Sequence, residues 1–201
     1  MRPKLLLVAA TVFAVAAQAG AQQPATKRIR GDIVAIEGTK LQVRTREGPV
    51  ADIDLDDKYT VTAVVKIAPS AIARGSFVGT ASMPEVDGTL RALEVLVFPE
   101  SGRGSGEGHY PWDLQPGSMM TNATVVEVVD VGAGRRMTLR YKDGEKVVTV
   151  PPAVPIVTFQ PGSREMVVPG AHVILSATVR PDGTLAATRM SVGKDGLVPP
   201  M

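Results

Sequence analysis

The chain has 201 residues, with 22 Lys and Arg, 20 Asp and Glu, no Cys and 4% aromatic residues. This length accommodates one or two domains, and the missing Cys excludes disulfides, thiolate zinc sites and a cysteine nucleophile. A nearly balanced charge and few aromatic side chains argue against a nucleic-acid surface, which needs clustered cations and stacking rings.

Residues 1–21 have the features of a secretory signal peptide. Arg2 and Lys4 precede an apolar run from Leu5 to Ala17, and small-x-small cleavage signatures end at Ala19 and Ala21. The run is shorter than the roughly twenty residues that span a bilayer. We therefore expect cleavage and a periplasmic or secreted protein with no later membrane span; an uncleaved anchor is the alternative.

Loss of the leader makes the mature chain formally neutral. Arg2 and Lys4 are the only charged residues of the leader, which leaves 20 basic and 20 acidic side chains. A phosphate polymer is bound by a field of clustered cations, and only Lys27–Arg30 approaches that composition. No nucleic-acid partner is expected.

Two similar segments follow the leader. The sequence Val86–Ala92 recurs as Pro181–Ala187, 95 residues later, and Gly75 and Gly170 share the same offset. We predict module 1 at 22–98, a Gly/Pro-rich connecting loop at 99–119, and module 2 with a C-terminal tail at 120–201.

Each module has the pattern of an all-β fold. Asp-Gly between alternating apolar runs is a strong hairpin signal, and no stretch after the leader keeps a helical period for twelve residues. Strands are predicted near 33–36, 41–45, 50–55, 77–81 and 90–98, then near 124–129, 137–141, 147–150, 173–179 and 185–192. Five to six short strands per module predict two tandem small barrels, OB-like in plan; a small sandwich is the alternative.

The glycine pattern of module 1 resembles a known family. Gly31-Asp32-Ile33-Val34, a glycine before the strand at Phe77, and the Asp-Gly-Thr-Leu turn at Asp87 are similar to a secreted bacterial β-domain family, domain of unknown function 5666. Module 2 is less similar, because Thr121–Val126 lacks the first glycine. The resemblance implies a secreted or periplasmic β-barrel module with no established activity.

The connecting loop has the most unusual composition. Its alternating glycines at Ser101–Gly108 are typical of a flexible linker, and they precede His109, Tyr110, Trp112 and Asp113. We predict that Tyr110 and Trp112 seal the seam between the two modules. The alternative is a ligand or partner contact through His109, Tyr110, Trp112 and Asp113.

A metal site in this loop is a further hypothesis. His109, Met119 and Met120 supply the imidazole and thioether donors that Cu(I) accepts. However, Met119 and Met120 are adjacent and face opposite ways on a strand. The other histidine, His172, takes the place of Phe77 in module 1, which favours a packed, hydrogen-bonded role.

No catalytic residue is predicted. The chain contains no Gly-x-Ser-x-Gly nucleophile elbow. The acidic stretch Asp52–Asp57 lacks the glycine of a hand-type Ca²⁺ loop, and its alternation is typical of the wet face of an edge strand.

We therefore predict a non-enzymatic binding or assembly module of the cell envelope, with no cofactor, whose partner is an envelope protein or a small ligand. The alternative is a small-ligand or copper-type metal carrier that uses the central His/Met loop.

Overall fold

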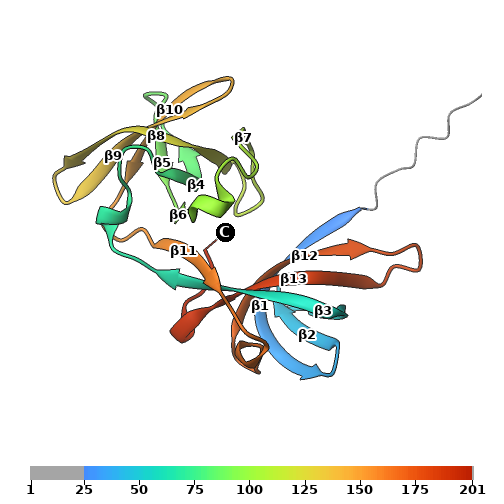
Figure 1. Cartoon of the computed structure of the whole chain (residues 1–201). Coiled ribbons are helices and arrows are strands. Elements are labelled where there is room, and N and C mark those ends of the chain that lie inside the picture. The colour runs from blue at the N-terminus through green and yellow to red at the C-terminus, as the bar shows by residue number, and fades with distance from the viewer. Residues whose placement is uncertain (1–24, 201) are drawn as a thin grey trace, which may run out of the picture.

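The structure, a computed structural model, describes residues 25–200 and consists of strands and short 3-10 turns (Figure 1). Within this range there is no α-helix, so no helix of the described part has the length and apolarity to cross a membrane. The all-β prediction is confirmed. The predicted signal peptide lies outside the described residues.

Thirteen strands follow one another along the described chain. They are β1 (Thr26–Glu37), β2 (Lys40–Thr45), β3 (Val50–Lys66), β4 (Phe77–Pro84), β5 (Leu90–Ala92), β6 (Val95–Val97), β7 (Gly108–Pro111), β8 (Met119–Val131), β9 (Gly134–Tyr141), β10 (Gly144–Val150), β11 (Ile156–Pro161), β12 (His172–Val179) and β13 (Leu185–Gly193). The 3-10 turns are η1 (Pro69–Ala71), η2 (Glu100–Gly102), η3 (Arg164–Met166) and η4 (Lys194–Gly196).

Strands β1, β2, β3, β13 and β12 form one closed, mixed barrel. Antiparallel pairs join β12 to β1, β1 to β2, β2 to β3 and β12 to β13, and a parallel pair between β13 and β3 closes the ring. Successive side chains of a strand point to opposite faces, so the alternate apolar residues Leu41 and Val43 enter the barrel core. They pack there with Ile29, Ile33 and Met190.

This barrel is built from both repeats. Strands β1–β3 come from the first repeat, whereas β12 and β13 come from the second. The prediction of two tandem barrels is therefore not what the structure shows: it shows one closed five-stranded barrel with eight further strands outside it. The reason is that β12 pairs with β1 and β13 pairs with β3, instead of with the N-terminal strands of their own repeat.

The strands outside the barrel show equivalent pairings, with the roles of the first and second repeats exchanged. In the barrel Leu185 lies opposite Ile53, and outside it Leu90 lies opposite Val148. Both residues of the second pair are displaced by 95 positions, one backward and one forward. Each repeat thus contributes its C-terminal strands to the N-terminal strands of the other.

The loops that lead into these strands show the same exchange. The Gly170 N–H donates to the Ile33 carbonyl at 2.8 Å, and the Gly75 N–H donates to the Val125 carbonyl at 2.7 Å. Both glycines have positive φ, 85° and 88°, a conformation that glycine adopts without steric cost. The shared offset of Gly75 and Gly170 therefore reflects two equivalent crossings between repeats.

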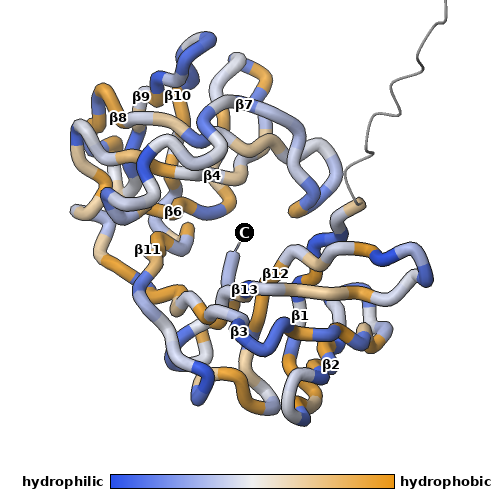
Figure 2. Tube along the Cα trace, turned by 45° about the vertical axis from the view of Figure 1, so that its right-hand side comes forward, coloured by the Kyte–Doolittle hydropathy of each residue, from blue (hydrophilic) through white to orange (hydrophobic). Residues whose placement is uncertain are grey.

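We use "seam" for the junction of the barrel with the other eight strands. The C-terminal half of β3 pairs with β11, and Val64, Leu96 and Val157 are buried there. Leu197 packs against this cluster and Pro199 is buried. Figures 1 and 2 both show the C-terminal end of the chain between the two bodies.

The two Asp-Gly turns are confirmed as matching hairpins. Asp87 Oδ1 accepts the N–H and O–H of Thr89 at 3.0 and 2.6 Å, and Asp182 Oδ1 accepts those of Thr184 at 2.9 and 2.7 Å. These turns connect β4 to β5 and β12 to β13. The hydrogen bonds within each turn are therefore the same in both repeats, although the strands pair between repeats.

The acidic stretch lies on a strand that is paired on both sides. Asp52 and Asp56 are exposed while Ile53 and Leu55 are buried, so the predicted alternation is present. The edge position was wrong, because β3 pairs with β2 and β13. Asp54 faces water on the barrel exterior, where hydrogen bonds from Lys40 and Arg180 lower its pKa.

Candidate functional site

The central loop folds back into a compact turn. The Trp112 N–H donates to the Ser118 carbonyl at 2.8 Å, and the Ser118 hydroxyl lies 2.9 Å from the Trp112 carbonyl and 2.7 Å from the Gln115 carbonyl. Strand β7, which the sequence did not predict, pairs with β8 just before this turn. The turn is thus held at both ends, and Trp112 and Asp113 project from a fixed base.

Two arginines of the barrel hold this turn across the seam. Asp113 Oδ1 lies 2.6 Å from Arg28 Nη1 and 2.7 Å from Arg30 Nη2. The Arg28 guanidinium carbon is also 3.8 Å from the centroid of the Trp112 ring, within the range of a cation–π contact. Strand β1 therefore fixes both the acid and the aromatic ring of the loop.

Trp112 is half-buried at this junction. Its ring lies 6.1 Å from the Tyr110 ring in an edge-to-face arrangement, and its indole nitrogen is buried with no hydrogen-bond partner among the described residues. A buried donor without an acceptor costs about 1–3 kcal/mol. The seam thus contains one donor that no residue of the described range satisfies.

A cleft of about 200 Å³ lies beside the indole. Its other walls come from the barrel strands β3, β12 and β13, and they present hydroxyls and one exposed guanidinium: Thr62, Ser176, Ser191 and Arg189. Most of the cleft lining is apolar, with Ile174 beside the indole. We call this the seam cleft.

The charges around Asp113 keep it ionised. Partial burial alone raises the pKa of this carboxyl, but the hydrogen bonds and positive charges of Arg30 and Arg28 outweigh it, so the net pKa is lowered. Arg46 also lies near Arg30, and burial together with the Arg30 charge lowers its pKa. Arg46 donates to the Pro199 carbonyl at 3.3 Å, which ties the chain end to the same region.

Glu94 is a buried titratable group that the sequence analysis missed. It lies between β5 and β6 and is fully buried. Its Oε1 accepts the Ala81 N–H at 3.0 Å, and its backbone carbonyl accepts the Thr80 hydroxyl at 2.6 Å. Oε2 has no hydrogen-bond partner in the described part of the chain.

Burial raises the pKa of Glu94 to about 8, although the hydrogen bond from Ala81 and the charge of Arg30 act in the opposite direction. The carboxyl is therefore mostly protonated at neutral pH. The available sequence signal was an acid within the apolar stretch Leu90–Phe98, at the position that the exposed Arg189 holds in the second repeat.

The His109 side chain does not join the contacts at the seam and instead lies against Thr121 and Tyr141. Its Nδ1 lies 2.9 Å from Thr121 Oγ1, its ring stacks on Tyr141, and burial lowers its pKa. Tyr110, the next residue along β7, is paired with Met120. Side chains of adjacent residues alternate, so Met120 faces away from His109.

The three proposed copper donors are therefore not brought together as a set. Only His109 and Met119 share a face, because His109 is paired with Thr121, two residues from Met119. Residues 25–200 also contain no group of three His, Asp or Glu side chains placed to hold a metal ion. Of the four predicted contact residues, Tyr110, Trp112 and Asp113 gather at the seam and His109 does not.

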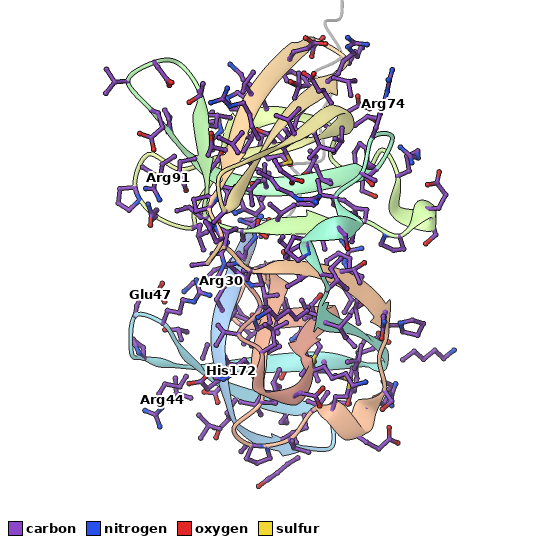
Figure 3. The ribbon with its side chains drawn as sticks, turned by 90° about the vertical axis from the view of Figure 1, so that its left-hand side faces the viewer. Arg30, Arg44, Glu47, Arg74, Arg91 and His172 are labelled. Carbon is purple, nitrogen blue, oxygen red and sulfur yellow. The ribbon has the colours of Figure 1, made fainter. Side chains whose placement is uncertain are left out.

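His172 has the hydrogen-bonded role that the sequence favoured. Its Nδ1 is 2.5 Å from Asp32 Oδ1 on the barrel exterior, where β12 pairs with β1. Figure 3 shows His172 on the barrel and Arg30 at the level where the barrel meets the other strands.

A scan against protein-family models finds no match, and comparisons with curated proteins and with solved structures find no similar protein. The resemblance to the secreted β-domain family therefore stays a prediction.

Proposed function

We propose that the chain is a non-enzymatic, exported binding or assembly protein of the cell envelope, and that a partner protein docks at the seam cleft. The supporting observation is the placement of Trp112 over the barrel by Asp113, Arg28 and Arg30. Trp and Arg are the residue types that most often anchor protein interfaces.

The size of the cleft favours a protein partner over a free small molecule. Its volume of about 200 Å³ is below the roughly 300–1,000 Å³ of small-molecule pockets, and it suits one side chain of a docked segment. The exposed Arg189 at its wall favours a carboxylate next to that side chain. The expected partner segment carries an apolar residue beside Asp or Glu.

We also propose that the strands outside the barrel form a second barrel of the same plan. The pairs β4–β8 and β5–β10 are the counterparts of β12–β1 and β13–β3. Met137, Leu139 and Val148 supply a buried apolar cluster there, as Leu41, Val43 and Ile53 do in the barrel.

Site-specific photo-crosslinking in the producing cell tests the docking site. A photoreactive residue replaces Arg189 at the cleft, and in a matched variant it replaces Arg44, which is exposed on β2 away from the seam. We expect a discrete protein adduct from position 189 only, and its loss when Trp112→Ala is added. No adduct at 189, or the same adducts from both positions, would contradict the proposal.

A further inference from the structure

The pairing between the barrel strands β12 and β13 is interrupted at one point. It stops at Ile174 and resumes at Thr178, so the register of these two strands passes over Ser176. In an antiparallel ladder, the backbone groups of successive residues point alternately to the two neighbouring strands. The Val179 N–H donates to the Ala25 carbonyl, on the β1 side. The Ser176 N–H is therefore directed toward β13, into the interruption.

The first repeat has the same interruption, and there an acid fills it. Strand β4 pairs with β6 at Gly79 and with β5 from Ser82 onward, which leaves Ala81 unpaired with these two strands. Ala81 is the counterpart of Ser176 at the offset of 95. Its N–H donates to Glu94 Oε1 at 3.0 Å, where a regular ladder would supply a backbone carbonyl. The chain thus contains its own example of a group that fits this interruption, a carboxyl.

In the second repeat an arginine stands in the place of this acid. Arg189 follows Glu94 by the same offset and lines the seam cleft together with Ser176. Both cleft residues are exposed, and none of the residues that line the cleft is Asp or Glu. Within residues 25–200 no acid is paired with Arg189. The interruption between β12 and β13 therefore faces an accessible cleft that offers donors and a positive charge.

We propose that an acidic side chain of the partner segment binds in this interruption, where its carboxylate accepts hydrogen bonds from the Ser176 N–H and the Arg189 guanidinium. The partner then supplies the kind of group that Glu94 supplies within the first repeat. The inference rests on the proposed docking function for the nature of the partner, and it names the two groups that select the acid.

The two interruptions favour different charge states of the acid. Glu94 is fully buried, which raises its pKa to about 8, so it accepts the Ala81 N–H mostly as a neutral acid. The seam cleft contains a guanidinium, and a nearby opposite charge favours the ionised form of an acid. Hydrogen bonds between a charged donor and a carboxylate are roughly twice as strong as neutral ones. The cleft is therefore expected to select Asp or Glu over Asn or Gln.

Amide NMR of the isotope-labelled mature protein tests this site without the partner. The probe is glutamic acid acetylated at its amino group and amidated at its α-carboxyl, and the same derivative of glutamine is the uncharged control. We expect the glutamate probe to move the Ser176 amide proton saturably to lower field, because a new hydrogen bond deshields it. The glutamine probe should bind at least about tenfold more weakly. Equal binding of the two probes, or no response at Ser176, overturns the proposal.

Variants of Arg189 test its part in the site, and its exposure makes them compatible with folding. Arg189→Gln should weaken the glutamate probe about tenfold. Arg189→Glu gives the second repeat the acid of the first, so the Ser176 amide should lie at lower field without any probe and no longer respond to it. Arg44→Gln, exposed on β2 away from the seam, is the matched control and should bind like the native protein. Unchanged binding in both Arg189 variants overturns the assignment.

The probe experiment and the crosslinking experiment fail independently. The photoreactive residue can also replace Thr62, on another wall of the cleft, which leaves Arg189 in place. A response of Ser176 to the glutamate probe without any protein adduct rejects the protein partner alone. An adduct from position 62 that Arg189→Glu leaves undiminished rejects the acid-binding site alone.

Discussion

Trp112 is the central-loop residue whose ring packs against Arg28 of the barrel. It is half-buried, stacked by Arg28 and packed edge-to-face with Tyr110. The sequence predicted its place at the seam from composition alone, since an isolated Trp in a Gly/Pro-rich connection must be held by side-chain contacts. The partners Arg28 and Arg30 were recognised only as a basic cluster, because their contact with Asp113 spans 85 and 83 residues.

Trp112→Ala is expected to lower the free energy of unfolding by about 2 kcal/mol, below the roughly 3–5 kcal/mol for a fully buried large aromatic. Urea denaturation followed by circular dichroism measures the change. Val86→Ala is the control, because Val86 is fully exposed, and it should change stability by less than about 0.5 kcal/mol. Equal effects of the two variants on the free energy of unfolding would show that Trp112 is not packed at the seam.

Glu94 makes the stability of the protein fall as pH rises. Its folded pKa of about 8 exceeds the unfolded value of about 4.3, so between these values the unfolded chain binds fewer protons and unfolding becomes easier. The penalty is absent below about pH 4.3 and complete above pH 8. Glu94→Gln should therefore match the native protein near pH 4 and exceed it by several kcal/mol near pH 9, on the order of 1.4 kcal/mol per unit of pKa difference.

Urea titrations at pH 4.5, 7 and 9 check this dependence. A constant difference between Glu94→Gln and the native protein at all three pH values would show that Glu94 is not a buried neutral acid. The burial of Glu94 was not predictable from the sequence, because the groups that contact it, Thr80 and Ala81, come from β4, 14 and 13 residues earlier in the chain.

At the scale of elements, the sequence predicted turns better than strand partners. The Asp-Gly hairpins follow from bonds within five residues, as at Asp87 and Thr89. The pairing of β13 with β3 joins Leu185 to Ile53, and no local pattern distinguishes Ile53 from its counterpart Val148. Both are apolar strand residues, so pairing Leu185 with either one fits the alternation of apolar and polar residues along the strands.

Two kinds of glycine position are expected to respond differently to alanine. Gly88 and Gly183 have φ of 81° and 84° with open space for a Cβ, so Gly88→Ala and Gly183→Ala should each cost about 1–2 kcal/mol from backbone strain alone. At Gly31 a Cβ would stand 1.9 Å from the Arg44 carbonyl oxygen. Gly31→Ala must force β1 away from β2 and should cost clearly more.

Urea denaturation of the three glycine variants compares these costs on one scale. A Gly31→Ala protein as stable as Gly88→Ala would mean that β1 and β2 do not approach as closely at this point. Unequal effects at Gly88 and Gly183 would mean that the two hairpins are not equivalent.

At the scale of the molecule, the exchange of strands makes the barrel depend on both ends of the described chain. The barrel needs β1–β3 and β12–β13, which flank the whole of the other body in the sequence. Repetition of the modules was predictable from the 95-residue offset. Their reciprocal pairing was not, because it joins strands far apart in the sequence, and the connections at 67–76 and 162–171 contain only short 3-10 turns with no distinctive pattern.

This architecture predicts a single cooperative unfolding transition. The barrel is assembled from two separated stretches of chain, and the buried seam residues Val64, Leu96 and Val157 come from strands on both sides of the junction. Urea curves from Trp112 emission and from circular dichroism should therefore coincide, as two-state unfolding requires. Two separated transitions would indicate independently stable modules.

The exchange of strands between repeats is tested most directly by engineered cysteine pairs, because the native chain has no Cys. Thr26 lies opposite Thr178 in the β1–β12 pair, whereas tandem modules would place Thr26 opposite Met83, the counterpart of Thr178 in the first repeat. On mild oxidation of dilute protein, Thr26→Cys/Thr178→Cys should form an intrachain disulfide, seen as a mass loss of about 2 Da and faster migration without reductant, since paired strand positions lie within disulfide reach. Thr26→Cys/Met83→Cys should stay reduced; an intrachain disulfide in this second variant and none in the first would contradict the exchanged fold.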